Sequence, residues 1–113
     1  MRCLELLSPA RNLEIGIAAI DCGADAVYIA GPDFGARKDA GNSFEDIASL
    51  CNYAHRFGAR VFVTYNIAVR EDELEELHSQ MLKAQEAGAD AFIVRDERIF
   101  EMKDITVPLH EST

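Results

Sequence analysis

The sequence predicts an α/β fold of parallel β/α units, the N-terminal half, with about four and a half units, of a TIM-like (β/α)8 barrel. The phrase Gly-Ala-x followed by an apolar run occurs three times, at residues 23–31, 58–66 and 88–96. Each phrase follows a helical pattern and opens a strand pattern. The three glycines follow one another at intervals of 35 and 30 residues, the length of a single β/α unit.

Each helical pattern has a residue suited to begin it and a glycine suited to end it. Asn12 and Ser43 precede the first two apolar stripes as candidate N-caps, and Asp46 gives the second a pattern close to a capping box. A third stripe covers residues 74–84. Left-handed backbone after a helix favours glycine, and the glycines stand at positions 23, 58 and 88.

The predicted strands are mostly continuous apolar runs, as expected when both faces of a parallel sheet are covered. They lie near residues 4–7, 26–30, 61–65, 91–94 and 106–112. The first βα turn, SPARN, lacks the G-x-G-x-x-G phosphate-binding pattern, so a barrel is preferred over an open doubly wound sheet. A barrel typically takes about 250 residues. We therefore expect residues 1–113 to form one α/β domain, a truncated N-terminal part of a larger barrel.

The charge balance argues against nucleic-acid binding by this stretch alone. Twenty acidic residues against 11 Lys and Arg give a formal net charge of −9, the wrong sign for attracting phosphates. No run approaches the roughly 18 consecutive apolar residues of a membrane helix. Glu5 interrupts the short apolar N-terminus, unlike a signal peptide. These features predict a cytoplasmic protein that does not engage a membrane.

The cysteines and local motifs indicate no metal site. Cys3, Cys22 and Cys51 are widely spaced and form no C-x-x-C pair. We expect buried, reduced thiols, the alternative being part of a cluster site completed elsewhere. The acids of residues 71–76 fit the first turn of a helix, where they complement its dipole on a solvated face. The sequence contains no H-E-x-x-H, G-x-S-x-G or P-loop motif, and it does not indicate which cofactor the protein uses.

The candidate site lies where the strands end, because both architectures place their active face there. His110 is the candidate general base or ligand, with Asn66 and Asp96 as its partners; alternatively it is a satisfied core histidine. Arg37 lies in the longest connection, 31–42, and could pair a carboxylate or phosphate, unless that connection is only a solvated loop. The candidate substrate-binding residues are Ser8, Phe34, Arg37, Arg95, Ser112 and Thr113.

The order of several phrases resembles the N-terminal part of the collagenase-like peptidase family. These phrases are ELLSPARNLE, GADAVYIAGPDFGAR, NSFEDI, RVFVTYNI, GADAFIV and VPLHEST. The resemblance implies a TIM-like barrel and carries over, as site positions, residues 8–10, 34–37, Asn66, His110 and 112–113. The family's signature block, rich in Glu, Gly and Cys, lies downstream of this region.

Three functions are expected, the first two of them implied by the resemblance. The first expectation is the N-terminal fragment of a peptidase that hydrolyses peptide bonds in a peptide or protein substrate, the fragment alone being inactive. The second is a factor for hydroxylation of transfer RNA, ribosomal RNA or ubiquinone, with an iron–sulfur cluster bound by downstream cysteines. The third is a non-catalytic binding or scaffold segment.

A half-barrel also predicts self-association. A sheet that stops at its fifth strand would expose two unpaired edges and its inward apolar side chains. Burying such a surface favours association, so we expect a homodimer formed through the exposed sheet edges.

Overall fold

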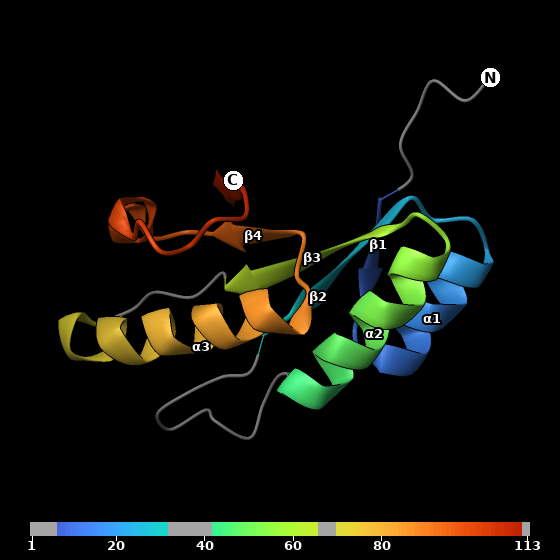
Figure 1. The fold of residues 1–113 in the computed structure, drawn as a ribbon, viewed down its shortest axis with the longest axis horizontal. Coiled ribbons are helices and arrows are strands. Elements are labelled where there is room, and N and C mark those ends of the chain that lie inside the picture. Colours follow the sequence, from blue (N-terminus) through green and yellow to red (C-terminus); the bar gives the residue numbers. More distant parts are fainter. Residues whose placement is uncertain (1–6, 32–41, 66–69, 112–113) are drawn as a thin grey trace.

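The computed structural model describes residues 7–31, 42–65 and 70–111, which form five parallel strands and three α-helices (Figure 1). In chain order the elements are β1 (Leu7–Ala10), α1 (Leu13–Asp21), β2 (Ala26–Ala30), α2 (Phe44–Arg56), β3 (Arg60–Tyr65), the 3-10 helix η2 (Glu71–Glu73), α3 (Leu74–Ala87), β4 (Ala91–Val94), the 3-10 helix η3 (Glu97–Glu101) and β5 (Leu109–Glu111).

The strand order distinguishes between the two architectures that the sequence leaves open. The strands lie side by side in the order β1-β2-β3-β4-β5, and every neighbouring pair is parallel. Right-handed crossovers that always advance by one strand place all their helices on the same face of the sheet. A doubly wound sheet would instead reverse its order and carry helices on both faces. The predicted barrel-type half sheet is confirmed.

The helix ends form as the sequence predicts. The Oδ1 atom of Asn12 accepts from the Ile15 amide at 2.9 Å, and the Ser43 hydroxyl accepts from the Asp46 amide at 3.1 Å. Each cap satisfies an amide that lacks an intrahelical partner. At the opposite ends, Gly23, Gly58 and Gly88 have φ angles of 101°, 71° and 115°, in the left-handed region that favours glycine.

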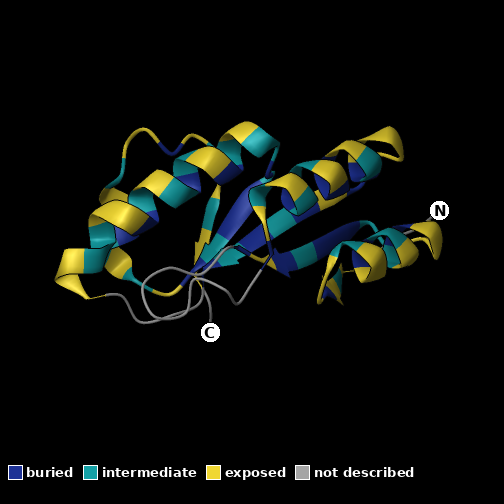
Figure 2. Ribbon diagram, turned by 90° about the horizontal axis from the view of Figure 1, so that it is seen from below, coloured by how far each residue is buried: buried dark blue, intermediate teal, exposed yellow. Residues whose placement is uncertain are grey.

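The core lies between the sheet and the helix layer, and buried helix residues face the strands (Figure 2). Alternate residues of the central strands point toward the helices, as the pleat requires. These strand residues are buried: Val27, Ile29, Val61, Val63, Phe92 and Val94. Ile47, Leu50, Leu77 and Met81 meet them from α2 and α3 and are fully buried. This continuous apolar layer holds the strands in register.

The first strand extends further than predicted. The prediction ended it at Leu7 and placed Ser8, Pro9 and Ala10 in the following turn, but β1 runs to Ala10. Pro9 is tolerated because β1 lies at the edge of the described sheet, next to β2, and an edge strand needs no ladder bond from every amide. Ser8 is therefore a strand residue, and its register with Val27 places it on the helix-covered face.

The last unit also differs from the prediction. Between β4 and β5 the described chain forms η3 in place of an α-helix, and β5 begins at Leu109. The Gln85 Oε1 atom accepts from the Thr106 amide at 2.7 Å and from the Val107 amide at 3.3 Å. These amides are turned toward α3, so they cannot join the ladder with β4. This explains why residues 106–108 are not part of the strand.

The face of the sheet opposite the helices is open in this chain. Leu7 is half exposed there, and Phe62 and Ile93 are only partly buried. The predicted homodimer concerns such surfaces, and a single chain leaves it a prediction. None of the described helices combines the length and apolarity needed to cross a membrane.

Replacing Gly31 by Ala should destabilise the fold. A Cβ atom there would lie 2.5 Å from the Cζ atom of Tyr65 and 2.6 Å from its Cε1 atom. We expect Gly31→Ala to lower the free energy of unfolding by about 1–3 kcal/mol, measured by urea denaturation. Adding Tyr65→Leu removes the ring, so the double variant should lose less than the sum of the single losses. Strict additivity would contradict this packing explanation.

Candidate functional site

Two rows of side chains line the open face of the sheet. The strand register places Tyr28, Phe62 and Ala91 in one row. Thr64, Ile93 and His110 form the next row toward the carboxyl ends of the strands. Because facing residues of paired strands share one side of the sheet, His110 points away from the helix layer. In a barrel this face is the interior, and the second row lies nearer the catalytic mouth.

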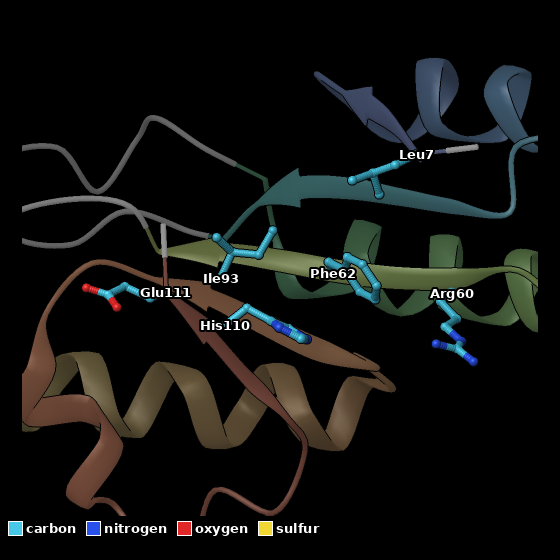
Figure 3. Close-up of a pocket in the computed structure, with 6 residues that line it drawn as sticks. All are labelled: Leu7, Arg60, Phe62, Ile93, His110 and Glu111. Atoms are coloured by element: carbon cyan, nitrogen blue, oxygen red, sulfur yellow. The ribbon is translucent and has the colours of Figure 1, made fainter. Parts of the chain in front are cut away.

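A pocket of about 490 Å³ lies on this face (Figure 3). It is lined by Leu7, Arg60, Phe62, Ile93, His110 and Glu111. Arg60 and Glu111 lie at opposite ends of the pocket, and the apolar side chains and the imidazole lie between them. This space is the inner side of the half-barrel, which in a complete barrel is lined by side chains from all of its strands.

His110 is exposed on the wall of this pocket and is not enclosed in the core. Its ring centroid lies 6.0 Å from that of Phe62, and the two planes are inclined by 38°. Both rings project from neighbouring parts of the sheet into the same space (Figure 3). The pair therefore presents a continuous aromatic surface to whatever occupies the pocket.

Asp96 follows β4 as predicted, but its carboxylate binds Arg98. It accepts from the Arg98 amide at 2.9 Å, from Nε at 3.0 Å and from Nη2 at 2.6 Å. Hydrogen bonding to the Arg98 side chain lowers the pKa of Asp96 below its ordinary value. Oδ1 thus caps η3 while Oδ2 pairs with the Arg98 guanidinium, and the structure does not present Asp96 as the partner of His110.

The other predicted site residues are placed only in part. Arg95 is exposed directly after β4, at the carboxyl rim. Ser8 faces the helix layer, away from the row that contains His110. The remaining candidates, Asn66, Phe34, Arg37, Ser112 and Thr113, lie outside the described residues and stay predictions.

Asn42 is a rim residue that the sequence interpretation missed. Its buried side chain donates from Nδ2 to the Ala30 carbonyl at 3.1 Å and to the Arg11 carbonyl at 3.4 Å. It thereby joins the ends of β1 and β2 at the start of α2. The only sequence signal was its position just before the Ser43 cap, which does not reveal burial.

Tyr65 and Gly31 form a second missed contact at the same rim. The Gly31 amide donates to the Thr64 carbonyl at 3.1 Å, which brings its backbone against the Tyr65 ring. Tyr65 is only 3% exposed, and this burial raises the pKa of its hydroxyl. The sequence showed a polar residue at a strand end, but not that it is buried.

The described residues do not form a metal or cluster site. Among them, no group of three or more His, Cys, Asp or Glu side chains is placed to hold an ion. Cys51 is buried as predicted, and burial together with Asp90 raises its pKa to about 12. Cys22 is exposed, contrary to the prediction, because it follows the last turn of α1. Cys3 lies outside the described residues, and the prediction of a cluster on downstream cysteines stays a prediction.

The family comparison agrees with the resemblance seen in the phrases. The model of peptidase family U32 matches residues 11–113. The chain is similar over 95% of its length to half of a type I 3-dehydroquinate dehydratase from Clostridium difficile, with a TM-score of 0.63. At 17% identity that likeness concerns the fold alone. It supports a half-barrel architecture.

Two curated relatives bear on function. The chain is 51% identical over 110 residues to a 23S rRNA 5-hydroxycytidine C2501 synthase of Escherichia coli, covering 97% of this chain and 17% of that protein. It is 38% identical over 98 residues to the tRNA hydroxylation protein P1 of Bacillus subtilis, covering 86% of this chain and 23% of that protein. The chain therefore spans about a fifth of these relatives.

These relatives overturn the prediction of peptide-bond hydrolysis. The family carries a peptidase name, but the relative with 51% identity is named for RNA hydroxylation, as is the relative with 38%. The phrases of the sequence identify the family without separating its activities, because they form the strands and helix ends common to the fold. The predicted reaction is therefore wrong, whereas the predicted fold is confirmed.

The ion pair at Asp96 should make stability depend on pH. The folded pKa of Asp96 is lowered, so its contribution is complete above the unfolded value of about 3.9 and is lost as the pH falls through the lower folded value. We expect Asp96→Asn to destabilise the protein at neutral pH, by a margin that shrinks below about pH 4. Chemical denaturation at pH values from about 2 to about 7 measures this margin. The matched variant Asp72→Asn alters an exposed pair with Arg70 and should change little; equal effects of both variants would contradict the prediction.

Asn42 should contribute to stability through its buried hydrogen bonds. Asn42→Ala leaves the Ala30 and Arg11 carbonyls without this donor and should cost about 1–3 kcal/mol in the free energy of unfolding. Chemical denaturation measures the loss. Asn52→Ala, on the exposed side of α2, should stay within about 0.5 kcal/mol of the unchanged protein. A loss no larger than this at Asn42 would show that its bonds do not join the strand ends.

Proposed function

The chain belongs to peptidase family U32, and we propose that the protein it forms part of supports hydroxylation of RNA, with a cytidine of 23S ribosomal RNA as the foremost target. The observation that carries the proposal is the 51% identity over 110 residues to a 23S rRNA 5-hydroxycytidine synthase. The tRNA hydroxylation relative is 38% identical, which favours the ribosomal target over transfer RNA.

In this proposal the chain supplies one half of the barrel wall and part of its mouth. Replacing the C5 hydrogen of cytosine by hydroxyl is a two-electron oxidation and needs an oxygen source and an electron acceptor. In this proposal the described residues form part of the barrel wall around the base. His110 is the polar side chain of the second inward row best placed for this, because it is exposed to the pocket.

The charge of the chain indicates how the work is divided within the longer protein. A formal net charge of −9 opposes the RNA backbone, so the main phosphate contacts would come from parts of the protein beyond this chain. This agrees with the expectation that the stretch alone does not bind nucleic acid. Hydroxylation of ribosomal RNA would place the protein in the cytoplasm.

The proposal is tested by nucleoside analysis in the native host. Deleting the gene should abolish 5-hydroxycytidine from purified 23S rRNA, as measured by mass spectrometry of digested nucleosides, and the full-length gene should restore it. Hydroxylated nucleosides of transfer RNA are measured in the same samples. Loss only from transfer RNA would reassign the target, and unchanged modification of both RNAs would reject the proposed activity in favour of a binding or scaffold role.

A further inference from the structure

We infer that Gln85, in the helix layer, is a positioning residue that sets the level along the sheet at which His110 lies. The inference rests on the proposed function, which places His110 beside the base, and it names the residue that holds His110 there. Gln85 belongs to α3, whereas His110 points to the opposite face of the sheet. Gln85 therefore acts only through the backbone that leads into β5.

The side-chain amide of Gln85 binds the backbone of the turn before β5 at three points. Its Oε1 atom accepts from the Thr106 amide at 2.7 Å and from the Val107 amide at 3.3 Å. Its Nε2 atom donates to the Asp104 carbonyl at 3.3 Å. His78, two turns earlier in α3, also binds the Asp104 carboxylate, at 2.6 Å. The turn is thus held on a helix that is itself packed against the sheet.

Pro108 forms the junction between this turn and the strand. It has no amide hydrogen, and its carbonyl accepts from the Phe92 amide of β4 at 2.9 Å. The amides of residues 106–107 are bound to α3, so the strand can begin to donate to β4 only after Pro108. This start places His110 opposite Ile93.

The apolar pattern of the last strand opposes a slip of one residue but not a slip of two. Ile105, Val107 and Leu109 pack against the core, and a slip of one residue would turn their side chains away from the helices. A slip of two residues keeps the alternation, because every second side chain lies on the same face. It would move His110 by roughly 6–7 Å along the sheet. The contacts of Gln85 distinguish the observed register from this one.

The test expresses variants of the full-length protein at equal levels in the host that lacks the gene and measures 5-hydroxycytidine in 23S rRNA. Gln85→Met keeps the length of the side chain but removes its amide, so the modified fraction should fall by about ten-fold or more. Gln85→Glu keeps an oxygen that accepts from the two backbone amides and should retain most of the modification. The matched control is Gln80→Met in the same helix. The Gln80 Oε1 atom is buried without a hydrogen-bond partner among the described residues, so this variant should modify the RNA normally.

Hydrogen exchange resolved to single amides separates a shifted strand from a general loss of stability. In Gln85→Met the amides of residues 106–107 should exchange faster, as should the Phe92 amide that binds the Pro108 carbonyl. Ile47→Val removes a buried methyl group from the core side of α2. It should lower the melting temperature while these amides and the RNA modification stay unchanged.

A double variant tests whether Gln85 acts through His110. In the His110→Ala background, Gln85→Met should cause little further loss of modification, because residues that act as a unit are not additive. Full additivity would overturn the inference, as would normal modification by Gln85→Met or an equal loss in Ile47→Val. A loss in Gln85→Glu as large as that in Gln85→Met would show that the acceptor does not hold the turn. If the unchanged protein hydroxylates no RNA, the proposed function fails, and unchanged exchange in Gln85→Met would separately reject Gln85 as the residue that fixes the strand.

Discussion

Parallel pairing of consecutive strands is the constraint on which the rest of this structure depends. A parallel neighbour can be reached only by a crossover, so every strand is followed by a connection that returns to the start of the next. Right-handed crossovers that advance one strand at a time put α1, α2 and α3 on a single face. One face of the sheet becomes a dry core, and the other is left to form a cavity. The pocket and the core are thus two results of the same connectivity.

The fold was predictable because its signals are local. Asn12 and Ser43 cap helices through bonds that span three residues, and Gly23, Gly58 and Gly88 need only their own φ angles. The start of the last strand was predicted wrongly because it is set by a residue far away in the sequence. Gln85, in a helix about 20 residues earlier in the chain, accepts hydrogen bonds from the amides of residues 106–107. The sequence of the last strand contains no pattern that predicts this contact.

The candidate site was predictable in position and less so in its contacts. The rule that strands end at the active face correctly placed His110 near the carboxyl end of β5, with its side chain on the open face. The same rule proposed Asp96 as the partner of His110, but the guanidinium of Arg98, two residues away, donates hydrogen bonds to that carboxylate. Asn42 and Tyr65 were missed because their importance lies in burial, which depends on how three strand ends meet.

The bonds of Asn42 have a consequence for how such proteins diverge. Gly31 and Asn42 mark the two ends of the connection between β2 and α2, and each end is fixed to the rim by its own contacts. When both ends are anchored, doubling the length of a flexible connection costs only about 0.6 kcal/mol in closure entropy. The contacts of Gly31 and Asn42 could therefore be kept when the length of chain between them changes. Evolution could exchange this segment to suit a new substrate while the barrel wall beneath it stays the same.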